Sequence, residues 1–278
     1  MTTCTRRRMA TMGITTTGRG SSIDGRVTLP PVPPALYAEL TPWYHLVDPP
    51  EDHADEAACF IEAFAGAIVG PSTTLLELGS GAGNNASHLK AQFACTLTDI
   101  SEPMLALSRA RNPECEHVAG DMRTLRLGRV FDAVLAHDGI TYMTTEPDLR
   151  AAIETAFVHT RPGGAAIFTP DDVADTFVEG AELHEGDDGE RSLRYIEWSW
   201  DPVPGDGKAR ADYALLMRER GDVRVFHDRH ETGLFARATW IRLLEDAGFA
   251  AESVRRPIGD GETDEIFVCR RPIDAGVG

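Results

Sequence analysis

The chain has 278 residues and a formal net charge of −17, from 27 basic and 44 acidic side chains. Its length suits one large α/β domain with an insertion, and its 42% of hydrophobic residues is ordinary for a globular protein. A surface this acidic repels nucleic-acid phosphates and anionic membranes, which disfavours both as partners. No apolar run approaches the roughly 18 residues that a membrane helix needs.

The five cysteines lie scattered at positions 4, 59, 95, 115 and 269. An odd number without a C-x-x-C pair argues against a disulfide framework and against structural zinc. We therefore expect a cytoplasmic protein without a metal site.

Residues 1–34 differ in composition from the rest, with many arginines, serines and threonines before prolines at 30, 31, 33 and 34. We interpret them as a disordered tail with a proline-rich lead, and a transit peptide is the alternative.

Helix and strand patterns alternate between residues 48 and 169. Short apolar runs predict strands over 73–78, 94–99, 115–119, 131–137 and 164–169. Helices are predicted over 48–70, with Asp48 as N-cap, and over 84–92, 102–111 and 148–160. This alternation predicts a parallel sheet with helices on both faces.

The pattern changes between residues 171 and 233, where strands are predicted over 191–201, 209–220 and 222–233. Gly-Asp pairs at 186–187, 205–206 and 221–222 are expected to form the turns of this antiparallel cap. A helix over 236–248 and strands over 249–257 and 264–272 follow. The expected units are thus a core with an N-terminal lid (35–170), an inserted cap (171–233) and the closing elements of the core (234–278).

A glycine-rich loop from Glu77 to Gly83 is the strongest chemical signal, with glycines at 79, 81 and 83 between a strand and a helix. Glycines let the backbone turn sharply and let a ligand approach, and the helix N-terminus points at that ligand. The segment 81–86 also fits G-x-G-x-x-A, so a nicotinamide cofactor is an alternative.

The pattern E-x-G-x-G-x-G over 77–83 resembles motif I of the class I S-adenosylmethionine-dependent methyltransferases. Four later segments resemble further motifs of that family in the expected order: SEPML (101–105), AGDM (119–122), FDAV (131–134) and RPGG (161–164). The resemblance implies a Rossmann-like sheet of seven strands, mostly parallel with the last antiparallel, and S-adenosylmethionine as the methyl donor.

The resemblance also implies roles for residues around this donor. Asp99 would accept the ribose hydroxyls, Asp121 would meet the adenine amino group, and Met104 and Met122 would lie beside the adenine. A tyrosine-bearing lid would close the site, although its aromatic residues could equally serve helix packing. The residues expected to bind the donor are Glu77, Gly79, Ser80, Gly81, Gly83, Asp99, Ile100, Met104, Asp121, Met122 and Ala136, with Tyr37 and Tyr44 from the lid.

The segment 136–142 follows a predicted strand, and ligands of open α/β sheets bind beyond such carboxyl ends. His137 and Asp138 are the best placed polar pair to take a proton from the acceptor. The alternatives are that His137 bonds the loop backbone and that Asp138 caps the next turn.

The acceptor is expected to contact Tyr142 in this segment and Trp198, Arg229 and Glu231 in the cap. The alternative for residues 225–231 is a solvated strand with cross-strand salt links.

Residues 213–235 and 238–249 are similar to the small-molecule branch of the family, which includes the N,N-dimethyltransferases of amino-sugar biosynthesis. We therefore expect methyl transfer to a small metabolite, with an amine favoured over a hydroxyl. The alternatives are a non-catalytic S-adenosylmethionine-fold sensor or partner subunit and, less favoured, a nicotinamide-dependent oxidoreductase. A homodimer is left open.

Overall fold

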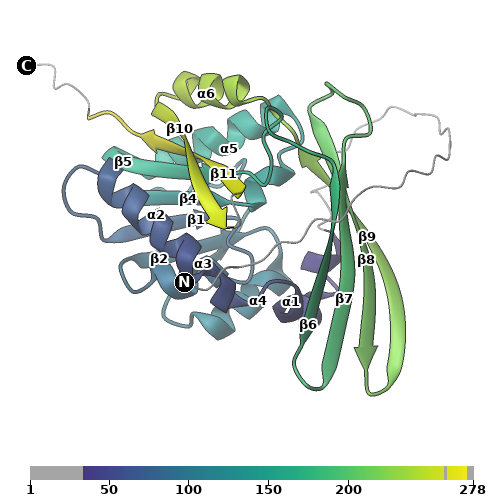
Figure 1. Cartoon of the computed structure of the whole chain (residues 1–278). Coiled ribbons are helices and arrows are strands. Elements are labelled where there is room, and N and C mark those ends of the chain that lie inside the picture. The colour runs from purple at the N-terminus through teal and green to yellow at the C-terminus, as the bar shows by residue number, and fades with distance from the viewer. Residues whose placement is uncertain (1–33, 260–261, 274–278) are drawn as a thin grey trace, which may run out of the picture.

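A central sheet of seven strands organises the computed structural model, which describes residues 34–259 and 262–273 (Figure 1). The strand order is β10-β11-β5-β4-β1-β2-β3. Of the described strands in this sheet, β11 alone runs antiparallel to its neighbours, which confirms the predicted fold class. The expected tail lies outside the described residues, except for residue 34. The strands are β1 Thr74–Leu78, β2 Ala94–Asp99, β3 Glu116–Ala119, β4 Phe131–His137, β5 Thr160–Thr169, β10 Ala250–Gly259 and β11 Glu262–Arg270.

Helices cover both faces of this sheet because its strands are apolar on both sides. One face packs on α2 (Ala54–Ala67) and α3 (Asn84–Leu89), and the other on α5 (Glu146–His159) and α6 (Arg237–Asp246). A further helix, α4 (Glu102–Arg111), lies against β2 and β3. Among the described helices, none has the length and apolar character to span a membrane.

Side-chain alternation along the strands decides which polar residues meet at the carboxyl edge. Leu75 of β1 and Leu135 of β4 both pack on the side of α2 and α3. Two residues further along, Glu77 and His137 therefore point to that same side, where each strand ends.

The second sheet stands beside the core and contains four antiparallel strands in the order β6-β7-β8-β9 (Figure 1). Its inner face packs on the N-terminal lid, which contains η1 (Ala35–Tyr37), η2 (Thr41–Trp43) and α1 (Tyr44–Val47). Their shared apolar cluster contains Leu40, Trp43, Leu46, Leu193, Tyr195, Leu215 and Met217. The strands of this cap sheet are β6 Gly180–Asp187, β7 Arg191–Trp200, β8 Lys208–Glu219 and β9 Asp222–Gly233.

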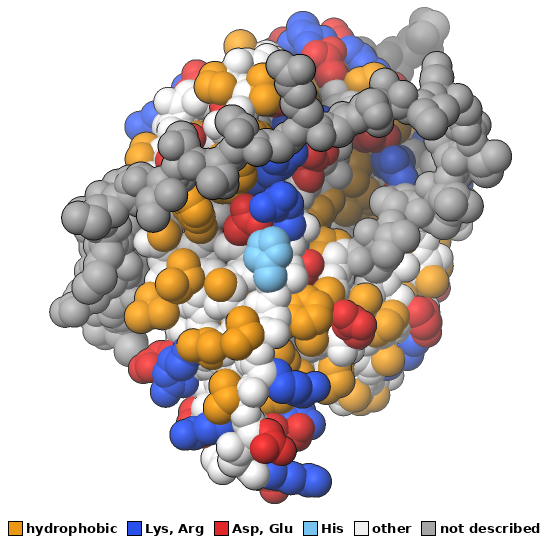
Figure 2. All heavy atoms as spheres, turned by 90° about the vertical axis from the view of Figure 1, so that its right-hand side faces the viewer, with side chains coloured by type: hydrophobic (Ala, Val, Ile, Leu, Met, Phe, Trp, Pro, Cys, Tyr) orange, Lys and Arg blue, Asp and Glu red, His pale blue; other side chains and the backbone are white. Residues whose placement is uncertain are grey.

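The outer face of the cap sheet points away from the core, and Figure 2 shows hydrophobic side chains gathered there among charged ones. Strand alternation places them on this side, because the residues between them point inward. The exposed large hydrophobic residues of the cap strands are Leu183, Ile196, Trp198, Leu216, Val223 and Val225.

Two local predictions are wrong. The helix expected over 48–70 is a 3-10 turn, η3 (Pro50–His53), followed by α2, and Asp48 is the C-cap of α1 rather than an N-cap. Strand β6 was not predicted, and the Gly186-Asp187 pair ends that strand instead of forming a turn. Its mixed sequence, GAELHEGD, carries little apolar alternation, and pairing with β7 holds it in the sheet.

Two glycines let the cap sheet seat closely on the rest of the protein. A Cβ added at Gly186 of β6 would overlap the carbonyl group of Leu46 in the lid. A Cβ at Gly233 of β9 would overlap the carbonyl group of Met143, which follows η4 (Gly139–Tyr142). The cap is therefore positioned by backbone-to-backbone contacts at both of its edges.

Gly186→Ala is expected to destabilise the protein by about 1–3 kcal/mol, because the new methyl group must push the lid backbone away. The measurement is the midpoint of urea unfolding. Gly66→Ala is the matched control, because nothing lies within 4 Å of that helical position. The control should be neutral or slightly stabilising. Unchanged stability of Gly186→Ala would contradict the proposed close contact between β6 and the lid backbone.

Candidate active site

The glycine loop connects β1 to α3 with three left-handed residues, since Gly79, Gly81 and Gly83 have φ angles of 74°, 54° and 71°. A Cβ at Gly79 would lie 2.8 Å from Met122 Cε, and one at Gly83 would overlap Ser108 and Asn112. These two glycines therefore serve packing within the protein. At Gly81 the nearest atoms to an added Cβ are Met104 Cε at 3.5 Å and Tyr44 Oη at 4.0 Å. Gly81 is therefore the position where a ligand can approach the backbone.

Asp99 at the end of β2 holds this loop in place. Its carboxylate accepts hydrogen bonds from the backbone N–H of Gly81 at 2.9 Å and of Ser101 at 2.7 Å. Burial raises its pKa, and these N–H donors oppose the rise. Ile100 beside it is 43% exposed, whereas Met104 on the next helix is buried under the loop. A carboxylate and two apolar side chains thus lie together at the end of β2. They suit a nucleoside, which has ribose hydroxyl groups and an apolar base.

Asp121 and Met122 follow β3 at the same edge. The guanidinium of Arg123 lies 2.6 Å from Asp121 and 2.9 Å from Asp148. Although burial alone would raise the pKa of Asp121, the bonds from Arg123 hold it below its ordinary value. Asp121 is therefore a fixed anion that can accept a further donor, such as an amino group.

Two buried polar atoms at this loop have no partner among the described residues, namely Glu77 Oε2 and Ser80 Oγ. Glu77 is 3% exposed, and burial raises its pKa to about 7 against the opposing charges of His137 and His53. Buried polar groups normally find partners. The orphaned atoms therefore fit a polar ligand, and the ammonium and hydroxyl groups of S-adenosylmethionine supply the donors that they lack.

A network of charged side chains lies next to Glu77 and centres on Glu56 of α2. Glu56 Oε2 lies 3.0 Å from His137 Nε2 and 3.3 Å from His53 Nδ1, while Oε1 accepts from Arg256 at 2.5 Å. Burial disfavours a charge here, yet His137, His53 and Arg256 hold the pKa of Glu56 well below its ordinary value. One carboxylate thus links α2, β4 and β10.

His137 has partners on both ring nitrogens. Its Nε2 lies between Glu56 and Asp138, at 3.0 and 3.1 Å, and its Nδ1 lies 3.2 Å from the Asn85 amide. Burial alone would lower its pKa, but the two carboxylates raise it to about 9. His137 therefore carries a proton at neutral pH and cannot accept another. The same Asn85 amide nitrogen also donates to Glu56 Oε2 at 3.1 Å, so Asn85 joins the network around this carboxylate.

Asp138 has a φ of 42°, a strained value for a residue other than glycine. Its backbone N–H donates to Thr169 at 3.0 Å, and its carbonyl accepts from Thr141 at 2.8 Å. The side chain remains 58% exposed on the side of the site. Burial raises the pKa of Asp138, and the charge of His137 opposes the rise. The carboxyl edge of β4 therefore presents a fixed imidazolium and an accessible carboxyl group.

The lid tyrosine Tyr44 lies near the glycine loop, with its Oη 4.0 Å from a Cβ added at Gly81. Tyr44 donates to Asp48 Oδ2 at 2.8 Å, and the same carboxylate group accepts from Asn84 and contacts His53 Nε2, both at 2.7 Å. Burial alone would lower the pKa of His53, but Asp48 and Glu56 raise it to about 10. Asp48, expected as a helix cap, instead connects the lid to α3.

The three cap residues expected to contact the acceptor point away from the core, whereas Tyr142 lies in η4 at the end of β4. Trp198 is 51% exposed on the outer face, where Arg229 pairs with Asp212 and Glu231 with Lys208. Alternation on β9 explains this correction, because odd-numbered residues there point outward.

The inward residues of β9 were missed by the sequence analysis. They are Asp228 and His230, which are 9% and 1% exposed. The same alternation selects them once the packing of Phe226 against the lid cluster identifies the inward face.

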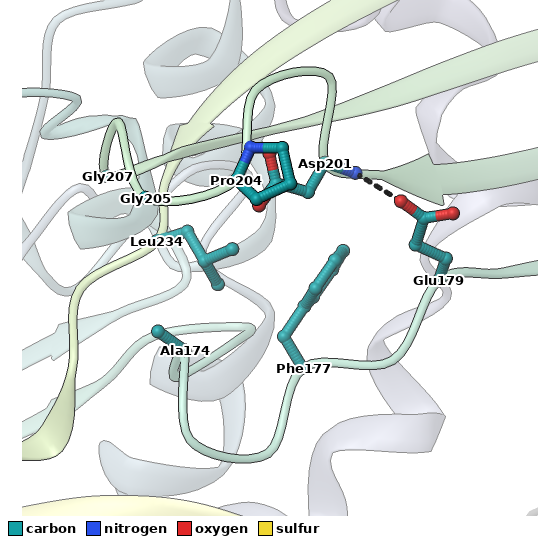
Figure 3. A pocket seen from close by; sticks show the side chains of 8 residues that line it. All are labelled: Ala174, Phe177, Glu179, Asp201, Pro204, Gly205, Gly207 and Leu234. Atoms are coloured by element: carbon teal, nitrogen blue, oxygen red, sulfur yellow. Dashed lines mark hydrogen bonds between the residues drawn. The ribbon is translucent and has the colours of Figure 1, made fainter.

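A pocket of about 390 Å³ lies between the connector after β5 and the β7–β8 turn (Figure 3). The backbone N–H of Asp201 donates to Glu179 Oε1 at 3.1 Å beside it. It shares no lining residue with the glycine loop and has no basic lining residue. The pocket is lined by Ala174, Phe177, Glu179, Asp201, Pro204, Gly205, Gly207 and Leu234.

Comparison with known proteins agrees with this geometry. A family model described as a methyltransferase domain matches residues 75–164. The dTDP-3-amino-3,4,6-trideoxy-α-D-glucopyranose N,N-dimethyltransferase of Streptomyces venezuelae is 30% identical over 65% of this chain and 77% of its own length. The chain belongs to the class I S-adenosylmethionine-dependent methyltransferases. It transfers a methyl group from S-adenosylmethionine to a small metabolite, as predicted.

Solved structures extend this relationship to the whole fold. DesVI of Streptomyces venezuelae has a TM-score of 0.74 at 26% identity, over 84% of this chain and 97% of its own. CalS10, an S-adenosylmethionine-bound amino pentose methyltransferase of Micromonospora echinaspora, has a TM-score of 0.69 at 26% identity, over 78% and 91%. These two structures therefore share the fold of this chain over most of its length.

Asp99→Asn is expected to weaken S-adenosylhomocysteine binding at least about tenfold, because the charged acceptor for hydroxyl donors is lost. Titration calorimetry measures the Kd, after circular dichroism has shown native folding. Glu102→Gln, a neighbouring acid that is 61% exposed and pairs with Arg109, is the control and should bind as the wild type does. Equal Kd values for Asp99→Asn and the wild type would overturn this role.

Glu77→Gln is expected to remove part of the pH dependence of stability. Because the folded-state pKa of Glu77 is raised, ionisation between pH 4.5 and 7 destabilises the ligand-free protein as pH rises. The loss approaches about 3 kcal/mol. Denaturant unfolding of both proteins at several pH values should show Glu77→Gln gaining stability relative to the wild type as pH increases. A pH-independent difference would contradict the assignment.

Proposed function

We propose that the acceptor is a dTDP-linked amino sugar, whose amino group receives one or two methyl groups. Three relatives, from Streptomyces venezuelae, Saccharopolyspora spinosa and Streptomyces fradiae, are all named as N,N-dimethyltransferases of dTDP-amino sugars. The observation in this chain that carries the proposal is the Asp138 carboxylate, exposed at the carboxyl end of β4, which suits a cationic amino group.

Bound S-adenosylmethionine supplies an electrophilic methyl group on a sulfonium centre. The residues of this chain bind and orient the two reactants, and such alignment is worth up to roughly 7–11 kcal/mol. Asp99 and Gly81 fix the nucleoside end, Glu77 suits the ammonium of the methionine part, and Tyr44 covers the loop from the lid. The lid and the inner cap face exclude water from the reacting centre.

His137 acts in this proposal as a fixed charge rather than as a base. Its imidazolium lies against Glu56 and Asp138 and holds the end of β4 in position. An amine nucleophile must be neutral when it attacks, so its proton must leave toward another group.

We also propose the partners, the compartment and the assembly of the protein. The net charge of −17 disfavours nucleic acid as a partner, and the free cysteines at 59, 95, 115 and 269 suit the cytoplasm. The apolar outer face of the cap is suited to pairing between two copies of the chain.

The test is incubation with S-adenosylmethionine and dTDP-3-amino-3,4,6-trideoxy-α-D-glucose, followed by mass spectrometry. We expect mono- and dimethylated products, and none with dTDP-glucose, which carries hydroxyl groups but no amine. Methylation of simple amines with no dTDP-amino sugar converted would contradict the proposed acceptor class.

A further inference from the structure

A buried histidine of the cap contacts a tyrosine of the core. His230 of β9 is 1% exposed, and its Nδ1 lies 2.8 Å from Tyr142 Oη of η4. Its Nε2 lies 3.2 Å from Asp228 Oδ2 on the same strand. Tyr142 Oη in turn lies 3.1 Å from Tyr37 Oη of the lid. Four polar side chains thus form one continuous chain from β9 to the lid.

Asp228 fixes the direction of these hydrogen bonds. Its carboxylate accepts from the backbone N–H of Leu36 at 2.9 Å and of Arg229 at 3.0 Å. Although burial alone would raise the pKa of Asp228, His230 and these donors hold it below its ordinary value. An ionised Asp228 only accepts, so Nε2 of His230 carries the hydrogen. The lone pair of Nδ1 then faces Tyr142 in the neutral ring.

The direction continues through both phenols. When the His230 ring is neutral with its hydrogen on Nε2, Tyr142 donates its one proton to Nδ1, and the Tyr142 oxygen accepts from Tyr37. When Nδ1 carries a hydrogen instead, Tyr142 donates to Tyr37 at 3.1 Å. In the first arrangement Tyr37 has used its own proton, and its oxygen is left with an acceptor site. Its ring centre lies 6.1 Å from that of Tyr44, which covers Gly81. The carboxylates of Asp138 and Asp171 also act on Tyr37, which places this phenol beside the carboxyl ends of β4 and β5.

We propose that Tyr37, Tyr142 and His230 form a proton relay that takes the proton of the acceptor's ammonium group before methyl transfer. This inference rests on the proposed function, because it requires an amine acceptor. Tyr37 would contact the amine, whereas His230 is a positioning residue that acts through the two phenols, and Asp228 supports it.

The relay balances without any additional reactant. The ammonium N–H bond breaks, and its electron pair stays on nitrogen as the nucleophile. That proton forms an O–H bond at Tyr37, the Tyr37 proton moves to Tyr142, and the Tyr142 proton forms the N–H bond at His230 Nδ1. The net change converts ammonium and imidazole into amine and imidazolium, and the imidazolium is stabilised by Asp228. A second methylation requires His230 to release this proton first.

The groups around the relay favour proton transfer through the phenols and disfavour the formation of a phenolate. Burial raises the pKa of Tyr37 and of Tyr142, so neither phenol loses a proton unless it gains another. Tyr213 of β8 packs against His230 with ring centres 4.6 Å apart, and burial also raises its pKa, with Glu197 of β7 adding to the rise. Asp228 is therefore the anion in contact with His230 among the described residues.

The test compares pH–rate profiles of kcat/KM for His230→Gln and the wild type with dTDP-3-amino-3,4,6-trideoxy-α-D-glucose. Near pH 7 we expect a loss of about 10²-fold, because the variant depends on amine that is already neutral. The rate of the variant should rise about tenfold per pH unit and approach that of the wild type above the amine pKa. Tyr142→Phe, which keeps the ring and removes the hydroxyl, should give the same pH dependence.

His227→Gln is the matched control. His227 lies on the same strand and also contacts an aspartate, with Nε2 at 2.7 Å from Asp212, but its side chain is 59% exposed on the outer face. Its profile should equal that of the wild type.

A pH-independent loss in His230→Gln or Tyr142→Phe would overturn the relay and leave a purely structural role. A wild-type profile in both variants would overturn it as well. If the wild type methylates no amine at all, the proposed function itself fails, so the two failures are distinguishable.

Discussion

One half-buried carboxylate, Glu56, joins three segments of the core near the glycine loop. It contacts His53 beside the lid, His137 at the end of β4 and Arg256 on β10. Ionic hydrogen bonds are strong where solvent is largely excluded. Removal of one of these side chains would leave the charge of its partner without compensation. The same contacts keep His137 protonated. His137 is the histidine at the end of β4, and because these contacts keep it protonated it cannot act as the base.

This constraint explains why the cap belongs to the catalytic unit. The core sheet provides the groups that fit the methyl donor, as sheets of this type do at their carboxyl ends. The inner face of the cap provides His230, whose Nδ1 lies 2.8 Å from Tyr142 of the core. Gly186 and Gly233 bring the cap backbone close enough for His230 to meet Tyr142. Closure by the lid adds Tyr37 to this contact.

The sequence predicted the core well because its signals are local. Apolar strands, the glycines at 79, 81 and 83 and the acid at 99 each have one physical explanation, and the fold and donor follow from them. The roles of His137 and of residues 225–231 depend on neighbours distant in sequence. Glu56 is 81 residues before His137, and no sequence pattern around either residue predicts their contact. Alternation on β9 was available from the sequence, but the inward face could not be selected without the lid that packs on it.

Histidine side-chain NMR of the protein with bound S-adenosylhomocysteine, near pH 7, most directly tests the different roles assigned to His137 and His230. Nitrogen chemical shifts report both the protonation state and the tautomer of each ring. The account predicts His137 as an imidazolium and His230 as a neutral ring with its proton on Nε2. A neutral His137, or a His230 ring protonated on Nδ1 in the resting enzyme, would contradict it.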